Sequence, residues 1–122
     1  MRVDLVVPPK AAAGQPVPIT LRIANTGKRP IELHLQGRTI TFDVIVEQSG
    51  AVVWRRLEGA TVPAILQIRV LGPGEVIELK DVWRQTDATG GQVAPGDYTV
   101  RGSVPTDGKP LRTAAVALRI TE

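Results

Sequence analysis

VPITLRIA, residues 17–24, is the stretch that decides the fold. The apolar side chains of Val17, Ile19, Leu21 and Ile23 alternate with Pro18, Thr20, Arg22 and Ala24. A period of two is typical of a β-strand that is covered on one face and wet on the other. Asn25-Thr26-Gly27 follows at once and has turn composition. The segment therefore predicts a half-buried strand that ends in a turn.

The same alternation recurs outward from this stretch, with turn residues roughly every ten positions and no helical period. Asp81 shares the parity of Ile77, Leu79 and Trp83, so we expect a bulge near Lys80-Asp81 to relieve that conflict. The pattern predicts an all-β, antiparallel β-sandwich of about eight or nine strands. The clearest strands are expected at 17–23, 31–35, 40–46, 51–56, 65–71, 75–84, 97–104 and 116–120.

The composition indicates one domain, residues 1–122, with an aliphatic core. Hydrophobic residues make up 43% of the 122 residues, whereas aromatic residues make up only 3%. Because strand-favouring Val, Ile and Leu dominate the periodic segments, they are expected to fill the core. Trp54 and Trp83 are expected to pack there as well, and Tyr98 is expected to form a tyrosine corner near the start of a late strand.

Charge and residue usage exclude several classes of function. The net charge is +3, but the arginines are scattered, and only Arg55 and Arg56 are adjacent, which does not predict nucleic-acid binding. No apolar run is long enough to span a membrane, and the chain has no cysteine for disulfides or thiolate metal sites. The first nine residues are too short for a signal peptide. A cytoplasmic location is expected.

The residues of catalysis are scarce. His34 is the only histidine, and it lies on the polar parity of its strand without a nucleophile motif nearby. Residues 86–91 (TDATGG) could wrap a hard cation through carbonyl oxygens, but a plain polar loop is the better interpretation. The sequence therefore predicts no enzyme, no cofactor and no metal site.

The irregular segment LEGATVPA, residues 57–64, is the candidate binding loop. It carries apolar side chains on a backbone interrupted by glycine and proline, and loops at the ends of a sandwich commonly bind partners. An ordinary crossover between the two sheets is the alternative interpretation. The candidate partner-binding residues are Leu57, Gly59, Thr61, Val62, Pro63 and Ile65.

A series of short motifs resembles one known family. They are Asn25-Thr26-Gly27, Phe42-Asp43-Val44-x-Val46, Gly50-x-Val52-Val53-Trp54-Arg55, Leu71-x-Pro73-Gly74-Glu75, Trp83, and Gly96-Asp97-Tyr98-Thr99-Val100-Arg101-Gly102. In this order and spacing they are similar to the BsuPI family of intracellular proteinase inhibitors. The resemblance covers roughly residues 16–104. It implies an immunoglobulin-like sandwich and inhibition of a cytoplasmic subtilisin-type serine proteinase, but it marks no reactive-site residue.

Two functions remain open, both of them non-catalytic. The first is a proteinase inhibitor whose extended loop occupies the cleft of the enzyme by main-chain pairing. The second is a structural or assembly module that binds a non-proteinase protein through a sheet edge or a face including Ile45, Arg22, Arg101 and Arg119. Glycan binding would need exposed aromatic side chains, and all are expected to be buried. The sequence leaves the oligomeric state open.

Overall fold

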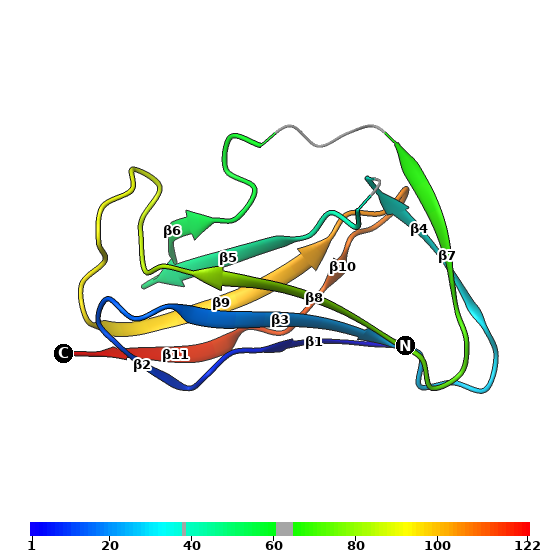
Figure 1. The fold of residues 1–122 in the computed structure, drawn as a ribbon, viewed down its shortest axis with the longest axis horizontal. Helices are drawn as coiled ribbons and strands as arrows, with labels where there is room; N and C mark the ends of the chain where they lie inside the picture. The colour runs from blue at the N-terminus through cyan, green and yellow to red at the C-terminus, as the bar shows by residue number, and fades with distance from the viewer. Residues whose placement is uncertain (38, 61–64) are drawn as a thin grey trace.

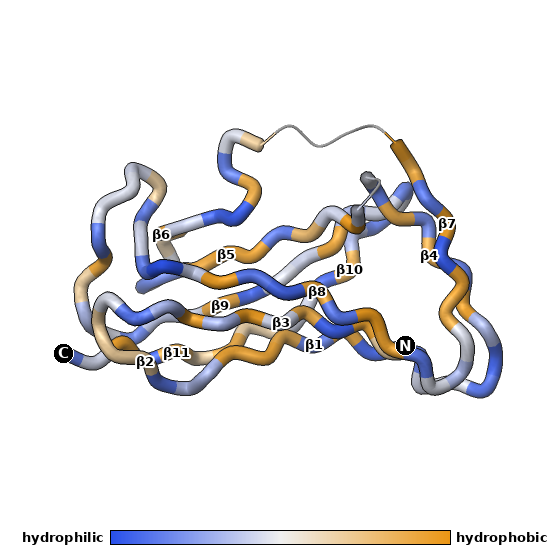
Figure 2. The backbone as a smooth tube through the Cα atoms, viewed as in Figure 1, coloured by the Kyte–Doolittle hydropathy of each residue, from blue (hydrophilic) through white to orange (hydrophobic). Residues whose placement is uncertain are grey.

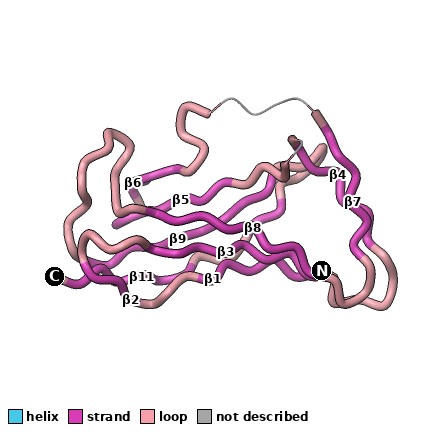
Figure 3. Tube along the Cα trace, in the orientation of Figure 1, coloured by secondary structure: helices cyan, strands magenta, loops and turns pink. Residues whose placement is uncertain are grey.

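The computed structural model describes residues 1–37, 39–60 and 65–122, and these form strands, turns and loops without a helix. Two sheets lie face to face, with a separate two-stranded sheet at one end of the molecule (Figure 1). Figure 3 shows the same arrangement by secondary structure, with strands throughout and loops gathered at the two ends. The prediction of an all-β sandwich is confirmed. Within the described residues, no helix is long and apolar enough to cross a membrane.

The smaller face-to-face sheet has the order β1-β3-β8, and both pairings are antiparallel. The larger sheet has the order β2-β11-β9-β5-β6, with β10 also pairing with β9. Its β2–β11 pairing is parallel, whereas the others are antiparallel. The strands of the smaller sheet are β1 (Arg2–Val6), β3 (Val17–Ala24) and β8 (Val76–Trp83). Those of the larger sheet are β2 (Lys10–Ala12), β5 (Asp43–Gln48), β6 (Ala51–Arg55), β9 (Gly96–Val104), β10 (Leu111–Arg112) and β11 (Val116–Thr121).

The remaining two strands, β4 (Ile31–Gln36) and β7 (Leu66–Leu71), form an antiparallel two-stranded sheet, which we call the end sheet. All eight expected segments contain a strand. The described residues also contain β1, β2 and β10, so the predicted number of eight or nine is too low. β2 and β10 are only three and two residues long, which is too short for a period of two to be recognised.

The core lies between the two sheets and is centred on β3. Its inward side chains, Val17, Ile19, Leu21 and Ile23, are each at most 1% exposed. Removing such a side chain from water stabilises the fold by roughly 1.5–3 kcal/mol. On the opposite sheet, a Cβ added at Gly102 would lie 2.7 Å from Cδ1 of Leu21. Glycine is therefore needed at this position of β9 because the two sheets approach closely there.

One end of the core is closed by aromatic rings. The ring of Trp83 is fully buried and lies 6.0 Å from Tyr98 and 6.2 Å from Trp54, centroid to centroid. The Tyr98 hydroxyl donates a hydrogen bond to the Ala94 carbonyl oxygen at 2.5 Å, which is the predicted tyrosine corner. Burial raises the pKa of Tyr98. Trp54 is only half-buried, so the core prediction holds fully for Trp83 and in part for Trp54.

The prediction of a bulge near Lys80-Asp81 is wrong. β3 and β8 pair without a break from Val17↔Trp83 to Ala24↔Val76, which leaves Asp81 on the inward face opposite Ile19. The carboxylate is tolerated there because β8 is a sheet edge and because Arg56 Nε lies 2.6 Å from Asp81 Oδ2. The ion pair joins β8 to the chain that follows β6, across the open side of the sandwich.

Two buried amide side chains hold the turns together. Asn25 Nδ2 donates to the carbonyl oxygens of Arg29 and Leu71 at 2.7 and 2.8 Å, and Asn25 Oδ1 accepts from the backbone N–H of Gly27. Gln85 Nε2 donates to the carbonyl oxygens of Ala12 and Gln15, both at 2.8 Å. Buried amides need such partners, since an unpaired one is costly.

Candidate functional site

The candidate loop connects β6, at the edge of the larger sheet, to β7 of the end sheet (Figure 1). It does not connect the two face-to-face sheets of the sandwich. Of the candidate residues, Leu57, Gly59 and Ile65 are described, whereas Thr61, Val62 and Pro63 lie outside the described residues.

The first end of the loop is fixed by Arg56. Besides its ion pair with Asp81, the Arg56 guanidinium donates to the Phe42 carbonyl oxygen at 2.7 Å and lies 3.8 Å from the centroid of the Phe42 ring. The Arg56 backbone N–H donates to the Val44 carbonyl oxygen at 2.9 Å. A cation over an aromatic face adds to these hydrogen bonds. Sequence reasoning missed this residue, because its partners are far away in the chain.

The next residues form a hydrogen-bonded turn. The backbone N–H of Leu57 donates to Asp43 Oδ1 at 3.1 Å, and the N–H of Ala60 donates to the Leu57 carbonyl oxygen at 3.0 Å. Gly59 has a φ of +68°, a conformation that favours glycine over other residues. Gly59 therefore shapes the turn, and Leu57 is half-buried at its start.

The second end of the loop is fixed to the chain after β4. The carbonyl oxygen of Ile65 accepts a hydrogen bond from the Gly37 N–H at 2.7 Å, and Gln67 Nε2 donates to the Gly37 carbonyl oxygen at 2.6 Å. The Ile65 side chain is 45% exposed. The described parts of the loop are thus held at both ends while an apolar side chain faces solvent.

β7 continues this apolar surface in an unusual way. Leu66, Ile68 and Val70 are 51%, 61% and 61% exposed, whereas Gln67 and Arg69 share the face of the buried Leu33 and Leu35. The alternation along β7 is visible in Figure 2. We call Leu66, Ile68 and Val70 the apolar stripe. Exposed apolar patches are typical of interaction surfaces.

β7 also offers main-chain hydrogen-bonding groups. Among the strands in the described part of the chain, only β4 pairs with β7. A strand with one partner leaves a row of N–H and C=O groups on its other edge, which is a template for pairing with an extended chain. The stripe and the free edge belong to the same strand.

His34 lies on β4, directly across from Ile68. Its Nε2 is 2.8 Å from Glu32 Oε1, and its Nδ1 is 3.2 Å from Asp107 Oδ2, with the imidazole partly exposed. In the described residues no Ser or Thr hydroxyl is hydrogen-bonded to it, so the arrangement lacks the nucleophile–base contact of hydrolytic sites. His34 is a surface residue between two carboxylates.

The loop at residues 86–91 is built around Asp87. Its Oδ1 accepts hydrogen bonds from the Thr89 hydroxyl, the Thr89 N–H and the Gly91 N–H at 2.7–2.9 Å. These donors, led by the Thr89 hydroxyl, lower the pKa of Asp87. In the parts of the chain that are described, no three potential metal-ligating side chains come together. The geometry is that of a polar turn closed by its own carboxylate.

The residues expected to form the binding face of an assembly module do not all lie on one face. Ile45 is only 8% exposed, and it pairs with Arg55 and Arg101 on the neighbouring strands. Arg22 lies in the smaller sheet and Arg101 and Arg119 in the larger one, so the three arginines do not share one face.

Comparisons with known proteins identify both sequence and structural relatives. The profile of the family described as "BsuPI: Intracellular proteinase inhibitor" matches residues 6–109. No curated protein sequence matches the chain.

Among solved structures, the CARDB domain of PF1109 from Pyrococcus furiosus, crystallised with di-metal ions, is 13% identical with a TM-score of 0.51, over 98% of this chain and 90% of that one. Spo0M, a sporulation control protein from Bacillus subtilis, is 12% identical with a TM-score of 0.53, over 99% and 49%. The alkylpurine DNA glycosylase AlkC from Pseudomonas fluorescens is 15% identical with a TM-score of 0.51, over 99% and 29%. At these identities the structures share the sandwich fold alone.

Proposed function

The chain belongs to the BsuPI family of intracellular proteinase inhibitors, and from this premise we propose that it inhibits a subtilisin-type serine proteinase through its 57–65 loop and the apolar stripe. The observation that carries the proposal is the stripe on the free edge of β7, which continues directly from the loop. The proposed contacts from the loop are Leu57, Gly59, Thr61, Val62, Pro63 and Ile65.

The chemistry of the stripe fits an extended-strand mode of binding. A β-edge supplies main-chain hydrogen bonds, and alternate side chains supply the contacts that enter pockets of the partner. Leu66, Ile68 and Val70 alternate in this way. A proteinase cleft that binds extended, apolar peptide segments would take this edge without any cofactor or covalent step.

The described ends of the loop support a binding role. Arg56 fixes the first end, and the Ile65–Gly37 hydrogen bond fixes the second. Chain ends that are already held in place lose less conformational freedom on binding, which favours affinity. The family description also supports a proteinase encountered inside the cell, and we propose the cytoplasm as the place of action.

Titration of a purified cytoplasmic subtilisin with this protein tests the proposal, with hydrolysis of a chromogenic peptide as the readout. We expect saturable inhibition, and Ile68→Lys should raise the inhibition constant by about tenfold or more, because a charge replaces an apolar anchor. Val52→Lys is the matched control, since Val52 is 44% exposed on β6, away from β7.

The outcomes separate the target from the site. Absence of inhibition at micromolar excess removes the subtilisin-type target. Inhibition that Ile68→Lys and Val52→Lys affect equally would instead remove the stripe as the contact.

A free edge can also pair with a protein that is not a proteinase, which is the assembly alternative. Retention of such a partner in a pull-down, unchanged after residues 57–64 are replaced by Gly and Ser, would favour it. Loss of retention in that variant would favour the loop as the contact.

A further inference from the structure

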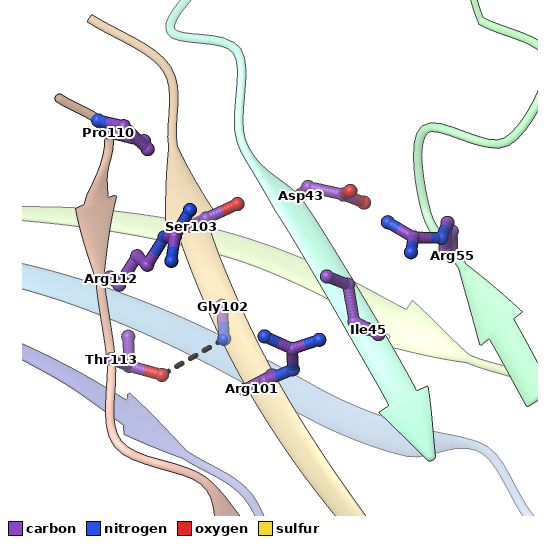
Figure 4. A pocket seen from close by; sticks show the side chains of 9 residues that line it. All are labelled: Asp43, Ile45, Arg55, Arg101, Gly102, Ser103, Pro110, Arg112 and Thr113. Atoms are coloured by element: carbon purple, nitrogen blue, oxygen red, sulfur yellow. Dashed lines mark hydrogen bonds between the residues drawn. The ribbon is translucent and has the colours of Figure 1, made fainter. Parts of the chain in front are cut away.

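A pocket of about 280 Å³ lies on the outer face of the larger sheet. Arg55, Arg101 and Arg112 line it together with Ser103, Asp43 and Ile45 (Figure 4). It is separate from the apolar stripe, which belongs to the end sheet. Neither the family description nor the proposed inhibition uses this pocket.

The strand register explains why three arginines meet here. Ile45 on β5 pairs with Arg101 on β9 and with Arg55 on β6, which forms one row across three strands. Ser103 on β9 pairs with Asp43 on one side and with Arg112 on β10 on the other, which forms the adjacent row. Neighbouring strands are about 4.8 Å apart, so Arg55 and Arg101 lie roughly 10 Å apart at the backbone, on either side of Ile45.

The charges in the pocket are incompletely paired. Arg101 Nε forms a short contact with Glu47 Oε1, at 2.5 Å. In the described part of the chain, by contrast, no carboxylate lies within ion-pair distance of Arg55 or Arg112, and the Ser103 hydroxyl makes no hydrogen bond. Three cations against the carboxylates of Asp43 and Glu47 leave one net positive charge.

Asp43 is a structural carboxylate that limits this field. Its Oδ1 accepts hydrogen bonds from the N–H groups of Val44 and Leu57 at 2.9 and 3.1 Å. It therefore stays in place beside the arginines and weakens their attraction for an anion. Ile45 supplies an apolar floor, being 8% exposed, and reduces competition from water.

We propose that Arg55, Arg101, Arg112 and Ser103 form a binding site for a small oxyanion that carries two negative charges, such as a phosphate group or a dicarboxylate. The planar guanidinium group donates two parallel hydrogen bonds to such oxygens, and a serine hydroxyl can donate a further one. The ligand bridges the two rows of the pocket. Because the site is open to solvent, its affinity for a bare ion lies in roughly the millimolar range.

Titration of the ¹⁵N-labelled protein followed by NMR tests the site, with sodium phosphate, sodium succinate and sodium chloride compared at constant ionic strength. We expect saturable shifts at the Nε–H groups of Arg55, Arg101 and Arg112 and at the Ser103 amide with phosphate or succinate, but not with chloride. The preferred ion distinguishes a phosphate-bearing ligand from a dicarboxylate.

Three variants make the test decisive. The double variant Arg55→Gln/Arg112→Gln should weaken binding about tenfold or more, because it removes the two unpaired cations. Asp43→Asn should tighten binding, because the amide oxygen keeps both backbone hydrogen bonds while the negative charge is lost. Arg84→Gln is the control, since Arg84 is an exposed arginine outside the pocket.

Shifts that chloride reproduces, or binding that survives in the double variant, would overturn the proposal. An absence of saturable shifts with both dianions would do so as well. The NMR spectrum of each variant shows directly that it is folded, so a loss of binding cannot be confused with unfolding.

Discussion

β3 and β7 have the same alternation of apolar and polar residues but opposite surroundings. On β3 the apolar side chains are at most 1% exposed, whereas on β7 the side chains of Leu66, Ile68 and Val70 are more than half exposed. β3 pairs with β1 and β8 and lies against the larger sheet. Within the residues that the structure describes, β7 pairs with β4 alone, at the end of the molecule.

The difference teaches that a period of two defines which residues share a face, but not which face is covered. On β7 the inward positions hold Gln67, Arg69 and Leu71, of which only Leu71 is buried, while the adjacent β4 supplies Leu33 and Leu35 to the core. The apolar face of β7 is then available for a partner. The contrast separates residues that stabilise the fold from residues that we propose contact a partner.

Matched isoleucine substitutions test the contrast most strongly. Ile19→Ala on β3 should lower the free energy of unfolding by about 2–5 kcal/mol, because it leaves a cavity in the core. Ile68→Ala on β7 should change it by no more than about 0.5 kcal/mol, because that side chain is exposed. Urea denaturation followed by tryptophan fluorescence measures both. Comparable losses in the two variants would show that the stripe is covered in solution.

Asn25 tests how the end sheet is attached to the sandwich. Asn25→Ala should cost about 2–4 kcal/mol, since it leaves the Leu71 and Arg29 carbonyl oxygens and the Gly27 N–H without their partner. Because Leu71 ends β7, hydrogen exchange should also accelerate in β4 and β7 more than in β3. Uniform acceleration across all strands would show that Asn25 acts on the whole fold instead.

Tyr98→Phe provides a smaller effect at the opposite, aromatic end. The substitution removes only the hydroxyl that donates to Ala94, so the expected loss is about 1 kcal/mol. The denaturation midpoint measures the loss, and the inhibition constant should stay unchanged because the apolar stripe is at the other end of the molecule. A change in inhibition would connect the two ends.

Asp87 gives the smallest expected effect, and it depends on pH. Its pKa is lowered in the folded state, chiefly by the Thr89 hydroxyl, from an ordinary value of 3.8. The carboxylate therefore stabilises the fold above that value, and this contribution is lost as the pH falls through the lowered pKa. Asp87→Asn should reduce the difference between urea midpoints measured at neutral pH and at about pH 3. An unchanged difference would assign the acid sensitivity to other carboxylates.

The local part of this structure follows from the sequence. Alternation and turn residues predict eight of the eleven strands in the described residues, and the Gly96-Asp97-Tyr98 motif predicts the tyrosine corner. Partners distant in the chain could not be predicted. Asp81 was expected at a bulge, because no neighbouring residue indicates that Asp81 pairs with Arg56, twenty-five residues away.

The candidate site shows the same division. Composition located the segment between β6 and β7, and the structure describes Leu57, Gly59 and Ile65 at its two ends. The stripe on β7 was missed, because its exposure depends on how the end sheet is oriented against the core. The Arg55–Arg101–Arg112 pocket was missed because it depends on register between four strands.

The parallel pairing of β2 with β11 has a consequence for synthesis of the protein. Residues 10–12 pair with residues 119–121, so β2 can join the larger sheet only after β11 has been synthesised. Contacts so distant in sequence form late and slow the folding of β proteins. Until then β9 lacks β11, and the nascent sheet exposes its edge to other chains. β2 is therefore synthesised early, whereas its partner β11 lies far along the chain.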